Sequence, residues 1–291
     1  MLPHRRAVDY TPLLHITESL LDRISGQGWM AAIADQLGWQ DQLRIDRCAL
    51  TFPGPAHALA PLCIAFASDF HAGPTTHART ITQACQVLRD LQPDLLLLGG
   101  DFVSYRASHI EALAQQLGEV PAPCGRFAVL GNHDLWADDR QIVQHLRQAG
   151  IQVLVNENVQ LPPPYSHVWL CGLDDPTSGS PDAAAMFRGA GECRIVLMHS
   201  PQGVPHIETY PYDLAVCGHT HGGQICLPNG RPIILPAGRY NRRYPSGHFQ
   251  IGCQSQQRLF VSRGVGYGGL PVRLFAPPDV LSSAISWRHD G

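Results

Sequence analysis

The chain has 291 residues and a formal net charge of −3, from 21 basic and 24 acidic residues. This balance argues against the basic stripe with which proteins bind a nucleic-acid polymer, and the length suits one large α/β domain. The nine cysteines include no Cys-x-x-Cys pair, which predicts buried core residues of a reducing compartment rather than a zinc–thiolate site.

The N-terminal region shows neither an export signal nor a membrane span. Residues 1–6 are basic, but no long apolar stretch follows them. We therefore expect a cytoplasmic protein. Residues 10–40 have helical periodicity with a break at 26–28, which predicts a pair of helices.

These helices have two interpretations, packing on the domain or peripheral contact with the inner face of the membrane. Trp29 and Trp39 favour the membrane. Acidic side chains oppose it, because an anionic bilayer attracts Lys and Arg; they are Glu18, Asp22 and Asp35. Both interpretations stay open at this point.

Strands and helices then alternate along the chain. Leu43–Phe52 predicts an edge strand that Pro53 ends. We expect buried strands that end at residues 68, 98 and 130, and helices over about 76–90, 108–117 and 138–148. This alternation is typical of βαβ units with a parallel sheet. After Gly150, short runs with turn residues predict a second, more antiparallel sheet.

Five apolar runs of the chain end in side chains of metal-ligand type. They lead to Asp69-Phe70-His71, Asp101, Asn132-His133-Asp134, His199 and His219-Thr220-His221. Sites of α/β proteins form at the carboxyl ends of such strands. Neutral imidazoles in alternate positions suit two neighbouring ions, and adjacent glycines let the backbone approach them. The pattern predicts a site for divalent metal ions.

These motifs, in this order, resemble those of the calcineurin-like metallophosphoesterases. The residues around these motifs are similar to those of one branch of the family, which contains bacterial membrane-associated phosphoesterases and UDP-2,3-diacylglucosamine pyrophosphatases. The similar segments are Ser-Asp-Phe-His, Gly-Asp-Phe-Val, Gly-His-Thr-His-Gly-Gly-Gln and Val261-Ser262-Arg263-Gly264-Val265-Gly266. The resemblance covers about residue 62 to the C-terminus. It implies a four-layer αββα sandwich of the α/β class, with two mixed sheets face to face and helices outside. We divide the chain into an N-terminal helical extension with an edge strand (residues 1–60) and a metallophosphoesterase domain (61–291).

The resemblance also implies which residues hold two divalent ions, with Asp101 as the bridging carboxylate. One ion takes Asp69, His71, Asp101 and His221, and the other takes Asp101, Asn132, His199 and His219. Mixed imidazole, carboxylate and amide ligands suit transition metals better than Ca²⁺. We expect Mn²⁺, with Fe or Zn²⁺ as alternatives.

Further residues are candidates for catalysis and substrate binding. His133 is not needed as a ligand, so its ring can protonate the leaving oxygen or stabilise phosphoryl charge, with Asp134 holding the ring. Arginine forks suit phosphate oxygens, and the candidates are Arg239, Arg242, Arg243 and Arg263. A solvated loop is the alternative interpretation for the segment that contains the first three.

Three functions follow. The first is a metal-dependent hydrolase that cleaves the pyrophosphate of UDP-2,3-diacylglucosamine to lipid X and UMP in lipid A synthesis, by attack of a metal-bound hydroxide on phosphorus. The second is a general phosphodiesterase or phosphatase for nucleotides or other soluble phosphate esters. The third is a scaffold without activity, which the complete ligand set disfavours.

Overall fold

The computed structural model describes residues 28–40, 43–54, 60–251 and 257–288, together with residues 20, 23 and 24. Most of the first expected N-terminal helix lies outside these residues. The second is α2 (Trp29–Gln36), in which Ala31 and Ala34 are buried. Within the described ranges, no helix is both long and apolar enough to cross a membrane.

The first sheet has the strand order β1-β12-β2-β3-β4-β5. Its strands are β1 (Arg44–Pro53), β2 (Leu62–Ala67), β3 (Leu95–Leu98), β4 (Arg126–Ala128), β5 (Gln152–Val153) and β12 (Asp279–Arg288). The expected edge strand is confirmed as β1, which pairs in parallel with β12 along its whole length. Strands β2 to β5 are parallel, as their continuous apolar character predicted, and β12 runs antiparallel to β2.

The second sheet has the order β10-β11-β9-β8-β7-β6. Its strands are β6 (Glu157–Gln160), β7 (Val168–Gly172), β8 (Cys193–Leu197), β9 (Leu214–Cys217), β10 (Gly247–Ile251) and β11 (Gln257–Val261). The expectation of a more antiparallel sheet is wrong for its interior, because β7, β8, β9 and β11 are parallel and only the edge strands β6 and β10 are antiparallel. The connecting helices have only five and four residues, too few to show a helical period.

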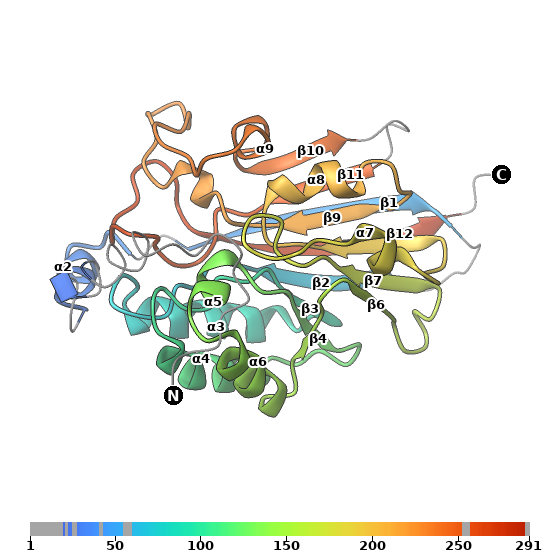
Figure 1. Ribbon diagram of the computed structural model, residues 1–291, viewed down its shortest axis with the longest axis horizontal. Coiled ribbons are helices and arrows are strands. Elements are labelled where there is room, and N and C mark those ends of the chain that lie inside the picture. Colours follow the sequence, from blue (N-terminus) through green and yellow to red (C-terminus); the bar gives the residue numbers. More distant parts are fainter. Residues whose placement is uncertain are drawn as a thin grey trace.

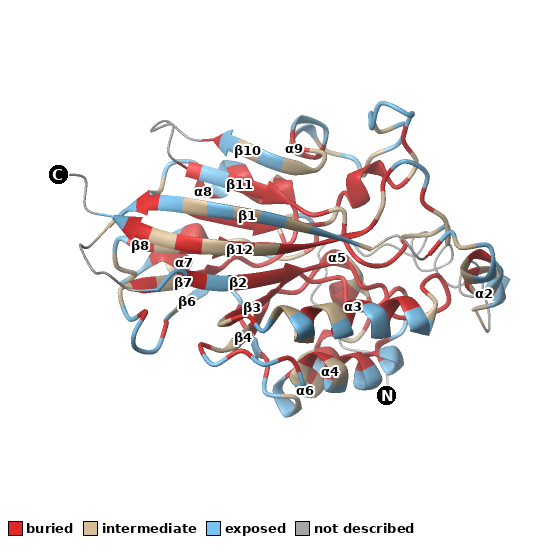
Figure 2. Ribbon diagram, turned by 180° about the vertical axis from the view of Figure 1, so that it is seen from behind, coloured by how far each residue is buried: buried red, intermediate tan, exposed pale blue. Residues whose placement is uncertain are grey.

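The two sheets face each other, with helices on both outer faces (Figure 1). The first sheet is covered by α3 (Ala78–Leu91), α4 (Ile110–Gly118) and α6 (Asp139–Gln148), and the second by α7 (Ala183–Phe187), α8 (Val204–Ile207) and α9 (Arg239–Arg243). In the view coloured by burial, interior strands such as β3 are red, whereas the edge strands β1 and β10 are mostly pale blue and tan (Figure 2). This confirms the four-layer αββα arrangement. The boundary placed at residue 60 stays a prediction.

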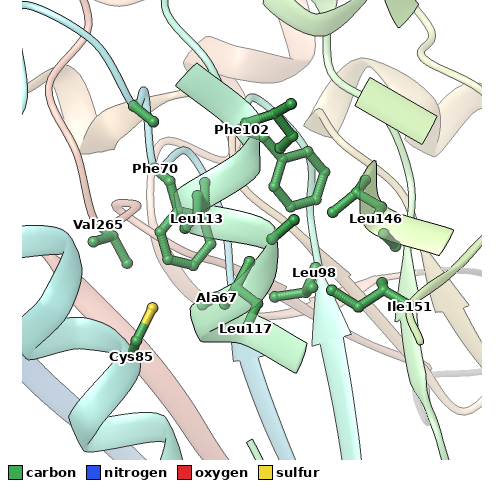
Figure 3. Packing of buried hydrophobic residues seen from close by; sticks show 14 of the residues in the cluster. Ala67, Phe70, Cys85, Leu98, Phe102, Leu113, Leu117, Leu146, Ile151 and Val265 are labelled. Carbon is green, nitrogen blue, oxygen red and sulfur yellow. The ribbon is translucent and has the colours of Figure 1, made fainter. Parts of the chain in front are cut away.

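Three apolar clusters hold the layers together. One fills the space between the sheets, and the others lie under the outer helices. Figure 3 shows the cluster beneath α3, α4 and α6, where Leu98 and Ala67 from the sheet meet Leu113 and Leu117 from α4. Full burial of a large apolar side chain contributes about 1.5–3 kcal/mol, so these clusters supply most of the stabilisation that keeps the strand ends in place.

Candidate metal centre

The candidate ligands follow directly on buried strands, in an unusual backbone conformation. Five of them have positive φ: Asp69 (55°), His71 (46°), Asp101 (52°), His219 (72°) and His221 (50°). A positive φ costs a residue other than glycine about 1 kcal/mol, and backbone strain of this kind is common at functional sites. The conformation of these turns therefore determines the direction in which the five side chains point.

Apolar anchors and glycines keep the turns in this conformation. Phe70 and Phe102 each follow a candidate ligand, are fully buried, and stack with their ring centroids 6.3 Å apart (Figure 3). On the other side, a Cβ on Gly131 would lie 2.2 Å from Asp101 Oδ1, and one on Gly218 would lie 2.1 Å from Asp69 Oδ2. Only glycine lets the backbone come this close to the two carboxylates.

One group of side chains joins Asp69, His71 and His221, whose ligand atoms all lie within 4.8 Å of one another. The Nε2 atoms of His71 and His221 face each other at 3.0 Å. Nε2 of His221 is also 3.7 Å from Asp69 Oδ1. Three donors aimed at one point are what a cation requires.

A second group joins Asp101, His199 and His219. Nε2 of His199 lies 3.1 Å from Nδ1 of His219 and 3.2 Å from Oδ1 of Asn132. The other ring nitrogen of His199 donates to the Gly99 carbonyl, at 2.7 Å, which leaves Nε2 as the ligand atom.

Asp101, a member of the second group, also lies close to the first. Its Oδ2 lies 3.6 Å from His71 Nε2 and 3.4 Å from His199 Nε2. Its Oδ1 accepts the backbone N–H of His133 at 2.9 Å, which fixes the carboxylate plane. The structure thus brings together all seven predicted ligands, with Asp101 in the central position expected of a bridge.

The protonation states of three of the four candidate histidine ligands suit metal binding. Burial and a neighbouring imidazole lower the pKa of His71 to about 3 and that of His219 to about 3, and they lower the pKa of His221 well below its usual value. All three rings are neutral at pH 7, the form that binds a metal. Burial would also lower the pKa of His199, but Asp101 and Asp69 raise it well above its usual value. The carboxylates therefore stabilise positive charge at this position.

The role expected of Asp134 is wrong. Nδ1 of His133 donates to the carbonyl of Ser104 at 2.7 Å, so a backbone group holds the ring. Asp134 points elsewhere, because successive helical residues face different directions, and it accepts the backbone N–H groups of Phe102, at 2.9 Å, and Gly131, at 3.0 Å. Asp134 instead joins the turns after β3 and β4, which carry Asp101 and Asn132.

A pocket of about 450 Å³ opens over the two groups. Its lining combines candidate ligands, His133 and Trp136 with five apolar residues: Ile225, Ile234, Leu235, Pro236 and Leu270. A larger cavity, of about 670 Å³, lies between α2, α3 and α4, but of the seven predicted ligands it contains none. The smaller pocket is therefore the candidate active site, and its size is typical of ligand sites.

The four predicted substrate arginines do not line this pocket. Arg263 forms an ion pair with Asp279 at 3.0 Å instead. The other three, Arg239, Arg242 and Arg243, are exposed on α9. Their contact with substrate stays a prediction that the pocket lining does not support.

Arg273 is a buried residue of the site that the sequence did not reveal. One nitrogen of its guanidinium lies 3.0 Å from Nδ1 of His221, and another donates to the His221 carbonyl at 3.2 Å. It also donates to the carbonyls of Gly264, Gly266 and Ala276, and lies 5.3 Å from the ring centroid of Tyr267. Arg273 thereby fixes the orientation of a candidate ligand.

Comparison with known proteins places this site in a family. A family model described as calcineurin-like phosphoesterase matches residues 63–223. Phosphodiesterase YaeI of Escherichia coli (strain K12) is 32% identical over 275 residues, which cover 92% of this chain and 95% of that protein. An uncharacterized metallophosphoesterase of Aquifex aeolicus (strain VF5) is 32% identical over 233 residues, covering 76% of this chain and 84% of that protein.

A third relative, the uncharacterized metallophosphoesterase YkuE of Bacillus subtilis (strain 168), is 29% identical over 219 residues, covering 73% of this chain and 75% of that protein. The matched segment contains every strand end that contributes to the two groups of side chains described above. The shared family, together with this clustering of His and Asp, makes the chain a metal-dependent phosphoester hydrolase of the calcineurin-like phosphoesterase family.

Proposed function

We propose that this hydrolase acts on a lipid-linked nucleotide, cleaving the pyrophosphate of UDP-2,3-diacylglucosamine to UMP and lipid X in lipid A synthesis. The observation that carries the proposal is the mixed lining of the pocket. Its metal-ligand side chains suit a pyrophosphate, whereas its apolar side chains, such as those of Ile225, Leu235 and Leu270, suit an acyl chain. A substrate that is polar at one end and apolar at the other fits both kinds of side chain.

We further propose the ligand assignment implied by the motifs. Asp69, His71, Asp101 and His221 would hold one ion, and Asp101, Asn132, His199 and His219 the other, with Mn²⁺ as the expected metal. The two groups of side chains and the shared Oδ2 of Asp101 support this assignment. Two divalent ions, when bound, lower the pKa of water and neutralise phosphate charge.

His133 is the proposed proton donor. Its Nδ1 is engaged by the Ser104 carbonyl, which leaves Nε2 for a substrate oxygen in the pocket. In the hydrolysis, a water oxygen bonds to phosphorus while the bond from phosphorus to the leaving oxygen breaks. Protonated Nε2 of His133 gives its proton to the leaving oxygen, and the water releases its proton to solvent.

The test is a paired turnover assay of the Mn²⁺-loaded protein. One substrate is UDP-2,3-diacylglucosamine in detergent, the other a soluble aryl phosphodiester, and Asp101→Ala is the blank. We expect preference for the lipid-linked nucleotide. Activity on the soluble ester alone would exclude the lipid-linked substrate but would still support metal-dependent hydrolysis at this site.

A general phosphodiesterase is the second candidate. It is supported by the E. coli relative, a phosphodiesterase by name, which is 32% identical and covers 92% of this chain. The same metal centre would serve both reactions, so the two candidates differ only in what the apolar side chains of the pocket bind. A variant that makes one of them polar, such as Leu235→Ser, should lose turnover of the lipid-linked substrate and keep that of the soluble diester if the first candidate is right.

A further inference from the structure

Large apolar side chains are exposed almost entirely in one region. Among the described residues, the exposed ones outside this region are Ile45 and Val155. The others belong to three segments: the α2 region with Leu20, Ile24, Trp29, Ile33, Leu37 and Trp39, a first loop with Leu227, Ile233 and Ile234, and a second loop with Leu270, Leu274 and Phe275. Scattered exposed residues need no explanation, but a concentration like this marks an interaction surface. We call these three segments the apolar rim.

Hydrogen bonds make the three segments one continuous surface. Gln40, just after α2, donates to the Pro271 carbonyl at 3.0 Å. Gln224 donates to the Leu270 carbonyl at 2.7 Å, and the backbone N–H of Cys226 donates to the Leu274 carbonyl at 2.8 Å. In both ribbon views α2 stands out at one end of the molecule (Figures 1 and 2).

Both loops of the apolar rim reach the candidate active site. Ile234 and Leu270 line the pocket and are also 68% and 56% exposed. Their neighbours Ile233, Leu274 and Phe275 are exposed without lining the pocket. The two loops thus carry exposed apolar side chains as far as the pocket that holds the metal-ligand side chains.

The charge beside the apolar rim is positive. Residues 214–278 contain no Asp or Glu but seven arginines: Arg231, Arg239, Arg242, Arg243, Arg258, Arg263 and Arg273. The first four, within or directly after the first loop, are exposed. On α2 the acidic residue is Asp35, which is paired with His77 at 3.6 Å and Arg79 at 3.8 Å. The partner that complements the two loops is therefore apolar and anionic.

We propose that the apolar rim docks on the surface of an anionic lipid bilayer and holds the pocket mouth against it. Tryptophan and aliphatic side chains together with arginine are the composition of surfaces that lie in the lipid interface. Trp29, Ile33 and Leu37 recur every four residues along α2, so they form one outward stripe. The inference rests on the proposed function, because docking would place the pocket where a lipid-linked substrate can enter it directly from the membrane.

Vesicle sedimentation of the full-length protein tests the docking. The test variant is Leu227→Ser/Ile233→Ser/Phe275→Ser, whose positions do not line the pocket, and the matched control is Val155→Ser. The wild type should bind phosphatidylglycerol vesicles more tightly than phosphatidylcholine vesicles, and less tightly in 0.5 M NaCl. The triple variant should lose at least about tenfold in partitioning, since each side chain gives up apolar burial. The control should stay within about twofold.

A second variant separates charge from apolar contact. Arg231→Gln should weaken binding to phosphatidylglycerol vesicles about fivefold and leave binding to phosphatidylcholine unchanged. In every variant, turnover of the soluble aryl phosphodiester reports an intact fold and metal centre. Equal vesicle binding by the wild type and the triple variant would overturn the proposal.

The oligomeric state is the competing explanation of the apolar rim. Light scattering that shows a wild-type dimer without lipid, and a monomer for the triple variant, would assign this surface to a second copy of the chain and refute lipid docking. The proposed substrate can be refuted separately from the docking. In that case the protein would not turn over UDP-2,3-diacylglucosamine, but its vesicle binding would still depend on Leu227, Ile233 and Phe275.

Discussion

Replacing Arg273 by methionine should weaken metal binding at least as much as it weakens the fold. Arg273 is buried and donates to four backbone carbonyls of this region, one of them that of His221, and its guanidinium also contacts the His221 ring. Methionine fills similar space but donates nothing. The turn that carries His221 then loses the group that holds its backbone, and Nε2 of His221 is free to turn away from His71 and Asp69.

The two magnitudes can be worked out separately. Four lost hydrogen bonds cost about 4 kcal/mol at roughly 1 kcal/mol each. Burial lowers the pKa of Arg273 to about 10, a shift that corresponds to about 3 kcal/mol of desolvation, which is regained when the charge is removed. The net loss of unfolding free energy is therefore about 1 kcal/mol. Loss of an outer partner of a metal ligand costs about 10- to 100-fold in metal affinity.

The assay is calorimetric titration of chelator-treated protein with Mn²⁺, beside urea unfolding of the same samples. Arg273→Lys keeps the charge but not the planar fork, so it should fall between the wild type and Arg273→Met. Arg258→Met, on the exposed side of β11, is the control and should change neither quantity beyond about 0.5 kcal/mol. Manganese affinity within twofold of the wild type in Arg273→Met would show that this arginine does not orient a ligand.

Three further predictions concern the centre and the core. His133→Ala should lower turnover by about 10²- to 10⁴-fold while both metals stay bound, measured by steady-state kinetics and metal analysis; loss of metal, or full activity, would contradict its role as proton donor. Gly131→Ala should abolish metal binding, because its Cβ would meet Asp101 Oδ1 at 2.2 Å, whereas Gly230→Ala, with open space around it, should retain metal binding. Burial raises the pKa of Asp213 to about 6, so the folded state disfavours the ionised form and unfolding free energy should fall as pH rises from about 4 to 6. Asp213→Asn should remove up to about 3 kcal/mol of this pH dependence in urea unfolding, and an unchanged slope would refute it.

The part of the fold that sequence predicted well is the part with a strong local pattern. Leu95–Leu98 is a continuous apolar run and forms a strand buried on both faces. The helix expected over 138–148 forms at Asp139–Gln148, where Asp138 accepts the backbone N–H of Gln141 as its cap. By contrast, the parallel interior of the second sheet depends on α7 and α8, which are too short to carry a period.

The same division holds for the site. Its candidate ligands stand out in the sequence because each follows an apolar run, and the ends of such buried strands meet at one edge of the sheets. The partners of those ligands have no such pattern. Arg273 reaches His221 across 52 residues of chain, and the group that holds His133 is a carbonyl, that of Ser104, which any residue type would supply. Adjacency in sequence misled in the case of Asp134, whose carboxylate points away from the ring beside it.

The backbone at the ligands explains why the metal centre and the stability of the fold are coupled. Five ligands with positive φ store about 5 kcal/mol, comparable with the whole net stability of a typical domain, about 5–15 kcal/mol. Burial of Asp69 raises its pKa to about 6, which adds the cost of desolvating a carboxylate. The apolar clusters on both sides of each sheet offset these costs, and Phe70 and Phe102 connect the strained turns directly to one of them. A cation bound among these carboxylates would offset the cost of desolvating them. Metal binding should therefore raise the free energy of unfolding by compensating part of the strain and desolvation at the site.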